Sequence, residues 1–373
     1  MKCNGTYLLK VRTRHGTFDF KNQKFYSPED GSQAFLQALP DEQAAITQGL
    51  KALAIRLCLD TASYEKARQT LAEITGQSLL RRQTLCNWVL KTAHCIDKQV
   101  QKEIQQGQDL PLPPLSDRID LYDPNARELH LFEDGILVKA QKETHEKQGV
   151  PKKAKIAQFH QSYFSLAPRP EGGYTFVFGP RDGPLEISAA LRAYFCREWQ
   201  GSTEPLCLVA ITDGAKDLRR HLREAFGEGL VIFLDWFHLR KKVCECASMM
   251  VSTKEARTQL KKQLLKLLFH GKVSEALDVI SEIPVRHKAM HEKLISYLTR
   301  HAEEILDYAR RAQAKKTIGS GRMEKGVDQV IGQRQKDRGM SWSARGSYAL
   351  GMVSAFLANG QWDQLWNASA SVA

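Results

Sequence analysis

Three acidic residues in this chain occupy local sequences that suit catalysis. Asp134 and Asp213 each follow an apolar, strand-like run and precede a glycine, and Glu324 follows the arm Gly319-Ser-Gly-Arg-Met. A carboxylate at the carboxyl end of a strand is held rigidly at the rim of a sheet, so three that converge there can hold divalent metal ions. Two such ions activate a nucleophilic oxygen and stabilise a leaving oxyanion, which is the chemistry of phosphodiester cleavage and transfer.

Each of these residues also has a plain structural explanation. Asp-Gly after a strand is common in simple turns. Glu324 stands between Arg322 and Lys325, which suits an ion pair. Glu133 directly precedes Asp134, and strand alternation lets only one of the two face the metal side. We prefer Asp134, the residue before glycine, and Glu133 is the alternative ligand.

A second polar pair, Asp235 and His238, follows the next apolar run. Asp235 suits the N-cap of a helix, and His238 suits packing against Trp236. The functional alternative is that the pair orients a ligand or handles protons at a scissile phosphate. Nearby, Cys244-x-Cys246 is expected to be core sulfur because no second Cys pair accompanies it, with structural zinc as the alternative.

The elements that must position these residues fall into three parts. Alternating residues around His15-Gly16 predict a β-hairpin in the region 1–40. Helical spacing predicts an all-helical module over 41–108, and the proline-rich stretch 105–114 is expected to be an extended connection. The remainder, 115–373, is expected to form the catalytic domain.

Within that domain, the pattern predicts a mixed sheet flanked by helices, an α/β fold. It is interrupted by an all-helical insertion at about 240–313, where no strand can be recognised. The predicted strands are 128–133, 160–167, 173–179, 206–212 and 230–235, and the predicted helices between them are 185–198 and 215–226.

The helical module has the pattern helix, glycine turn, helix, with the turn at Gly76. This is typical of a helix-turn-helix, although an ordinary αα-hairpin shows the same apolar pattern. In a helix-turn-helix the residues at the position of the recognition helix are Arg81, Arg82, Gln83 and Asn87.

Composition favours a polyanionic partner. The chain of 373 residues has 54 Lys and Arg against 42 Asp and Glu, a net charge of +12, and its basic residues occur in runs. Any single run is equally explained as a solvated helix face. The eight cysteines lack disulfide or zinc spacing, so we expect reduced thiols. No signal sequence or stretch of roughly 18 to 20 apolar residues is found, so we expect a cytoplasmic protein with no membrane partner.

With these segments in place, the chain resembles prokaryotic insertion-sequence transposases of the DDE type, allied to the Mutator-like group. The resemblance covers most of the chain from about residue 60. It is carried by Thr212-Asp-Gly-Ala-Lys-Asp-Leu, by Phe233-Leu-Asp-Trp-Phe-His-Leu, and above all by the segment from Gly319-Ser-Gly-Arg-Met-Glu-Lys-Gly to Gly339-Met-Ser-Trp-Ser.

The resemblance implies an RNase H-like catalytic fold with a helical insertion between the second aspartate and the glutamate. Asp134, Asp213 and Glu324 match the catalytic, metal-binding triad, while Asp235 and His238 match an accessory Asp-x-x-His motif. The expected cofactor is Mg²⁺, with Mn²⁺ as the alternative. The residues expected to engage DNA phosphates are Arg322, Lys325, Arg334, Lys336 and Arg338, and Trp342 is expected to stack on a distorted or flipped base.

The expected activity is binding of the terminal inverted repeats of a mobile element, DNA nicking, and joining of the freed 3′ hydroxyl to target DNA. The expected partners are double-stranded DNA and further copies of the chain, and the expected location is the nucleoid. The alternatives are an inactive or amino-terminally truncated DNA-binding remnant, a regulator, and an RNase H-like nuclease that does not join strands.

Overall fold

The computed structural model divides the chain into two compact units. Unit 1 comprises Met1–Ile96, Val138–His160 and Gln329–Ala373, and unit 2 comprises Asp97–Leu137 and Gln161–Asp328. The boundaries between these units fall inside helices and strands, whereas the predicted boundary lies in the proline-rich stretch. The structure describes residues 2–29, 31–34, 45–116, 118–141, 158–178, 184–283, 286–336 and 339–367.

Unit 1 begins with the predicted β-hairpin. Strand β1 (Lys2–Thr13) pairs antiparallel with β2 (Gly16–Ser27), and Thr13 lies opposite Gly16. Gly16 has a φ of +117°, which only glycine adopts readily and which a tight turn requires here. Short strands β3 (Gly31–Ala34) and β4 (Ala45–Ile46) complete a sheet of order β3-β2-β1-β4.

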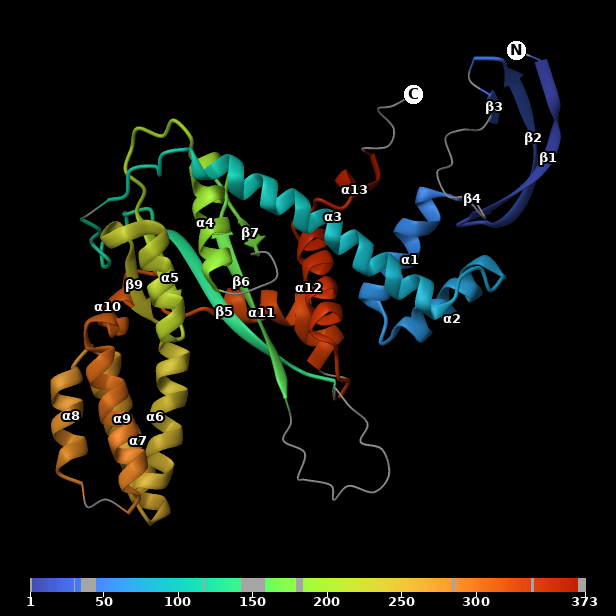
Figure 1. Ribbon diagram of the computed structural model, residues 1–373. Coiled ribbons are helices and arrows are strands. Elements are labelled where there is room, and N and C mark those ends of the chain that lie inside the picture. Colours follow the sequence, from blue (N-terminus) through green and yellow to red (C-terminus); the bar gives the residue numbers. More distant parts are fainter. Residues whose placement is uncertain are drawn as a thin grey trace, which may run out of the picture. The chain divides into compact units, whose positions relative to one another are not determined.

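Three helices follow in the predicted helical module (Figure 1). They are α1 (Gln48–Asp60), α2 (Tyr64–Thr75) and α3 (Arg82–Gln108). The hydroxyls of Thr47 and Ser63 cap the first two by accepting backbone N–H groups, and α2 ends at Gly76 in the left-handed conformation. The local chemistry that predicted helix, glycine turn, helix is therefore present.

Two residues predicted to face DNA instead lie in the interior of unit 1. Arg334, in the π-helical segment η3 (Asp328–Lys336), is 4% exposed, and Trp342 is 5% exposed. The Arg334 guanidinium donates to the carbonyl oxygens of Cys58 (3.0 Å) and Ala62 (2.8 Å) at the end of α1. It also lies over the Trp342 ring, whose indole N–H donates to a backbone carbonyl. The prediction that these two side chains bind phosphate and base is corrected by this burial, because Arg334 Nε and Nη1 and the Trp342 indole nitrogen donate to backbone carbonyls of the same unit.

Unit 2 is built on a five-stranded mixed sheet flanked by helices. The strand order is β7-β6-β5-β8-β9, with β5, β8 and β9 parallel and β7 antiparallel to β6. The elements, shown in Figure 1, are β5 (Leu129–Lys139), β6 (Phe159–Pro168), β7 (Tyr174–Val177), α4 (Pro184–Glu198), β8 (Leu208–Thr212), α5 (Lys216–Phe226) and β9 (Val231–Leu234). Every predicted strand and helix of this region is found within a few residues of its predicted position, except that β5 is longer.

The core of this sheet also determines where α3 ends. Ile104 of α3 belongs to the same buried cluster as Leu131, Leu191, Leu208 and Phe226. A Cβ on Gly107 would lie 2.5 Å from the Ala193 Cβ, so α3 contacts α4 at backbone distance. The helix therefore continues to Gln108, into the stretch predicted to be extended, because its last turns bury apolar surface in unit 2.

Strand β5 does not stop at Asp134 as predicted. It passes through Glu133, Asp134 and Gly135 and continues to Lys139, and its ladder with β8 extends from Leu129 to Phe132. Asp134 therefore lies just beyond the ladder and not at the end of the strand. A Cβ on Gly135 would lie 2.8 Å from the Gln161 amide nitrogen. The close approach of β6 side chains therefore favours glycine at this position.

A helical insertion follows β9, as predicted. It consists of α6 (Trp236–Met250), α7 (Lys254–Phe269), α8 (Val273–Ser281), α9 (Lys288–Arg300), the short helix η2 (Ala302–Glu304) and α10 (Tyr308–Gln313). It starts at Trp236, slightly before the predicted residue 240. In the described parts of the chain, no helix is both long and apolar enough to cross a membrane.

A buried ion cluster ties the end of the insertion to the start of β5. Arg311 is fully buried and donates to both oxygens of Glu128, at 3.2 and 2.9 Å, and Lys316 lies 2.8 Å from the same carboxylate. Burial raises the pKa of Glu128, but hydrogen bonds from His130, Arg311 and Lys316 outweigh it and lower the pKa to about 2. Glu128 is therefore ionised at neutral pH and keeps both cations satisfied.

We expect Arg334→Ala to lower the free energy of unfolding by about 3 kcal/mol, because two carbonyl oxygens lose a charged donor inside unit 1. Chemical denaturation followed by circular dichroism measures this loss. The control is Lys336→Ala, an exposed base two residues along the same segment, for which a change within about 0.5 kcal/mol is expected. Equal effects of the two substitutions would contradict the interior role of Arg334.

Candidate active site

Asp235 is a carboxylate of unit 2 with both oxygens hydrogen-bonded. It directly follows β9 and is fully buried. One oxygen accepts from the backbone N–H groups of Phe237 (2.5 Å) and His238 (3.2 Å), which caps α6 as predicted. The other oxygen accepts from both the backbone N–H and the hydroxyl of Ser320. Asp235 therefore joins the end of β9 to the segment that precedes Glu324.

The glycine before Ser320 makes this connection sterically feasible. A Cβ on Gly319 would lie 2.4 Å from the Phe237 ring. The neighbouring Ile318 carbonyl accepts from the Trp236 N–H at 3.1 Å, and the Asp235 N–H donates to the Thr212 carbonyl at 2.8 Å. Helix α11 (Gly321–Val327), with Glu324 exposed in its first turn, thus starts beside the ends of β8 and β9.

The charge of Asp235 is stabilised by its neighbours. Burial raises the pKa of this carboxyl, but the His238 imidazole and the two Ser320 donors outweigh burial and hold the pKa below its usual value. His238 Nδ1 lies 3.5 Å from the nearer Asp235 oxygen, which is an ion-pair distance without hydrogen-bond geometry. Asp235 raises the pKa of His238 despite burial, and Asp213 and Asp134 raise it further.

Asp134 lies where the charges of the other predicted residues converge. Burial, then the Asp213 charge, raise the pKa of Asp134 to about 6. Glu324 raises this pKa as well, whereas His238 and the Gly135 N–H lower it. Asp213, His238 and Glu324 therefore each lie within electrostatic range of Asp134.

Asp213 occupies the turn that was one of the two explanations of its Asp-Gly sequence. It is half-buried directly after β8, and one of its oxygens accepts from the Ala215 N–H at 2.8 Å, in the turn before α5. Gly214 has a φ of +85°, so the turn requires glycine. The turn thus fixes the backbone of Asp213 and leaves its second oxygen for other partners.

Glu133 is a buried carboxyl with neither oxygen hydrogen-bonded in the described structure, and it is 2% exposed. Burial, and secondly the Asp213 charge, raise its pKa to about 8, so it is mostly protonated at neutral pH. Asp134 interacts with Asp213, Glu324 and His238, whereas Glu133 interacts with Asp213 alone among these. This pattern favours Asp134 as the member of the pair that faces the other carboxylates.

The donor chemistry of this region suits a divalent cation. Carboxylate oxygens are hard ligands, and the mutual repulsion that raises the pKa of Asp134 is what a dication relieves. In the positions described, no three Asp, Glu, His or Cys side chains lie close enough together to coordinate one ion. The donor types therefore fit Mg²⁺ or Mn²⁺. Coordination of one ion would require the carboxylate side chains to move closer together.

The residues predicted to contact DNA differ in accessibility. Arg81, Arg82, Gln83 and Asn87 are exposed at the start of α3, where the Gln83 amide donates to Asn87 at 3.0 Å. Lys325 and Lys336 are exposed, as is Arg322, whose guanidinium lies 5.1 Å from the centre of the Tyr174 ring. Arg338 lies outside the described residues.

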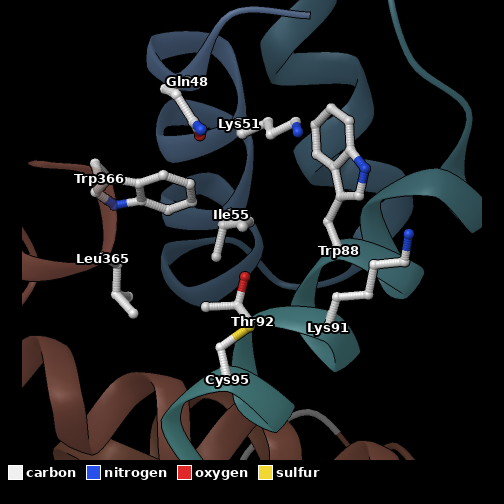
Figure 2. Close-up of a pocket in the computed structure, with 9 residues that line it drawn as sticks. All are labelled: Gln48, Lys51, Ile55, Trp88, Lys91, Thr92, Cys95, Leu365 and Trp366. Carbon is white, nitrogen blue, oxygen red and sulfur yellow. The ribbon is translucent and has the colours of Figure 1, made fainter. Parts of the chain in front are cut away.

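Unit 1 also contains a cavity of about 200 Å³ lined by α1, α3 and α13 (Gln364–Asn367). Figure 2 shows Trp88 and Trp366 on opposite sides of it and the Lys51 side chain reaching toward Trp88. It is smaller than the roughly 300 to 1,000 Å³ of most ligand pockets. The candidate catalytic residues all belong to unit 2, so this cavity is not part of their site.

Comparison with known proteins matches a family model in the amino-terminal region and one solved structure at low similarity. The model of an uncharacterised protein family (UPF0236) matches residues 7–110, which hold the hairpin and the three helices of the amino-terminal region. No curated protein matches the chain. A chain of the Drosophila P element transposase strand transfer complex aligns at 12% identity over 89% of this chain and 82% of that chain, with a TM-score of 0.28. A score this low does not establish a common fold.

We expect Glu133→Gln to reduce the pH dependence of stability. The carboxyl has a pKa of about 8 when folded and 4.5 as its ordinary value, so the folded protein retains a proton that the unfolded chain loses. Stability is therefore highest below pH 4.5 and falls as pH rises toward 8, by up to about 5 kcal/mol from this group. Glutamine does not ionise, so the variant should lack this loss.

Urea unfolding at pH 5 and pH 8.5 in the presence of a chelator measures the effect. The exposed Glu204→Gln is the matched control and should follow the wild-type pH dependence. If Glu133→Gln and the wild type lose the same stability between the two pH values, Glu133 is not a protonated buried carboxyl.

Proposed function

We propose that this protein is a DDE-type transposase that cleaves DNA at the ends of a mobile element and joins them to target DNA. The observation that supports the proposal is that Asp213 and Glu324 both lie within electrostatic range of Asp134, a partly buried carboxyl of unit 2. The strand order β7-β6-β5-β8-β9 is compatible with an RNase H-like fold, and the helical insertion lies between the second aspartate and the glutamate, where the family resemblance requires it.

Asp134, Asp213 and Glu324 would hold divalent metal ions, Mg²⁺ or alternatively Mn²⁺. Bound at these carboxylates, the ions supply a deprotonated nucleophile and stabilise the leaving oxygen. Asp235 fixes the relative position of β9 and α11 and so sets where Glu324 stands. The raised pKa of His238 favours its imidazolium form, which can donate to a phosphate oxygen beside the carboxylates.

Double-stranded DNA is the partner that the charge and the exposed residues favour. The net charge of +12 attracts a polyanion, and exposed cations accompany both the amino-terminal helices and Glu324. We assign α2 and α3 to a helix-turn-helix that recognises terminal repeats, with α3 as the recognition helix. Two element ends must be cut together, so the chain would act as an oligomer on DNA in the nucleoid.

We expect Asp134→Asn, Asp213→Asn and Glu324→Gln each to lower the rate of Mg²⁺-dependent cleavage of terminal-repeat DNA by at least about 100-fold. Each isosteric amide removes a charge that would stabilise the metals, and such stabilisation is worth several kcal/mol. Single-turnover cleavage on labelled DNA gives the rate, and binding is measured alongside by anisotropy. Glu228→Gln, which alters an almost fully exposed carboxylate of the same unit, is the control.

A folded triad variant that cleaves like the wild type removes that residue from the site. Pre-cut DNA ends separate the closest alternative function: cleavage without joining of pre-cut ends to target DNA identifies a nuclease. DNA binding without either reaction identifies a regulator or inactive remnant.

We expect substitutions in α3 to separate two kinds of DNA contact. Asn87→Ala should relax specificity by about 1 to 3 kcal/mol for repeat over random DNA, because an amide can read a base edge. Arg82→Ala should instead weaken binding to all sequences. It should also reduce the slope of log binding constant against log salt concentration by about one, because one phosphate contact is lost. Titrations at several salt concentrations measure both. Lys102→Ala, an exposed base later in α3, is the control, and an effect no larger than that control would favour a simple αα-hairpin.

A further inference from the structure

His301 is a buried histidine at the point where the helical insertion returns toward the sheet. It directly follows α9 and is 1% exposed. Its Nδ1 lies 2.8 Å from a carboxylate oxygen of Glu304, in the next short helix. Its Nε2 is buried and has no hydrogen-bond partner in the described structure. A buried polar atom without a partner costs about 1 to 3 kcal/mol, so the burial of this edge of the ring requires an explanation.

Glu304 fixes the orientation of the His301 ring. The second oxygen of Glu304 accepts from the Arg219 guanidinium of α5. Burial raises the pKa of Glu304, but the hydrogen bonds from His301 and Arg219 outweigh it and lower the pKa. An ionised carboxylate only accepts, so His301 Nδ1 carries a proton and donates it. The chain Arg219, Glu304, His301 therefore aims the Nε2 edge in one direction.

That direction leads to the turn that carries Asp213. A Cβ on Gly214 would lie 2.8 Å from His301 Cε1 and 3.1 Å from Nε2. The same Cβ would also lie 2.8 Å from the Cδ1 atom of Leu234 in β9. The His301 ring and a side chain of β9 thus both pack closely against Gly214, on the side where any other residue would carry its Cβ.

Tyr297 gives further evidence that the end of α9 lies near Asp213. Its ring centre lies 4.6 Å from that of His301, one turn earlier on α9. Burial, then the charges of Asp213 and Glu304, raise the Tyr297 pKa above its usual value. The phenol therefore lies within electrostatic range of both carboxylates, which places the carboxyl end of α9 beside Asp213.

We infer that His301 is a positioning residue for Asp213: Glu304 fixes its ring, and the ring holds the Asp213–Gly214 turn in the orientation that metal binding needs. This inference rests on the proposed function, because it assigns a purpose to the orientation of a metal-binding carboxylate. It also gives the helical insertion a role in the active site. Residues that orient a metal ligand from outside the coordination shell typically change metal affinity or activity by about 10- to 100-fold.

The test is binding of Mn²⁺ alone to the DNA-free, full-length protein by isothermal titration calorimetry. His301→Ala should raise the dissociation constant by at least about 10-fold at a temperature where the variant is folded. Glu304→Gln keeps the shape of the side chain and loses its charge, so it should raise the constant by a smaller factor, and it serves if His301→Ala does not fold. His291→Ala is the matched control, because this histidine also lies on α9 but bonds to the Ile280 carbonyl at 3.0 Å.

Asp213→Asn, measured in parallel, separates the two levels of the proposal. If it weakens Mn²⁺ binding while folded His301→Ala and Glu304→Gln bind like the wild type, the role of His301 is overturned and the proposed function stands. If Asp213→Asn itself binds like the wild type, the proposed function fails and the role of His301 fails with it. Weaker Mn²⁺ binding by both His301→Ala and Glu304→Gln, with His291→Ala binding like the wild type, supports the inference.

Discussion

The arrangement of the candidate site depends on the hydrogen bonds of one fully buried carboxylate, that of Asp235. Its two oxygens bind different segments: one caps α6, where the helical insertion begins, and the other holds Ser320, where the chain leaves the insertion for Glu324. A buried charge is tolerated only when its lone pairs are satisfied, so neither segment can move away without a large cost. This constraint closes a loop of more than eighty residues at its base.

The remaining acidic residues of the site have fewer partners than Asp235. Asp134 is partly buried, and burial, followed by the charges of Asp213 and Glu324, raises its pKa, while Glu133 next to it is buried without a hydrogen bond. Elsewhere in the unit, buried acids such as Glu128 and Glu304 have cationic partners that lower their pKa. The raised pKa values of Glu133 and Asp134 therefore set the proposed site apart from these ion pairs.

Local sequence predicted the secondary structure of unit 2 well, but it predicted less well which side chains of the protein are exposed. Apolar runs bounded by polar residues located β6, β8 and β9 closely, whereas Glu-Asp-Gly in β5 was interpreted as a strand end. The strand continues because Ile136 and Val138 bury their side chains, which a local turn signal cannot reveal. Arg334 was predicted on the surface from its basic neighbours, yet three-dimensional contacts supply carbonyl oxygens and aromatic rings that make its burial favourable. His301 and Glu304 lie close together in the sequence, but the residues that they contact, Gly214 and Arg219, are distant in the chain.

The sequence by itself determined the types of element, the order in which they occur and the acidic residues at or near the ends of apolar runs, because apolar periodicity and turn chemistry act over a few residues. Tertiary structure alone decided which carboxyl groups act on one another electrostatically, that Glu133 is buried without a hydrogen bond, and which arginines remain accessible. Those outcomes depend on side chains separated by about a hundred residues or more, whose distances are set by sheet order and core packing and leave no periodic signal in the sequence.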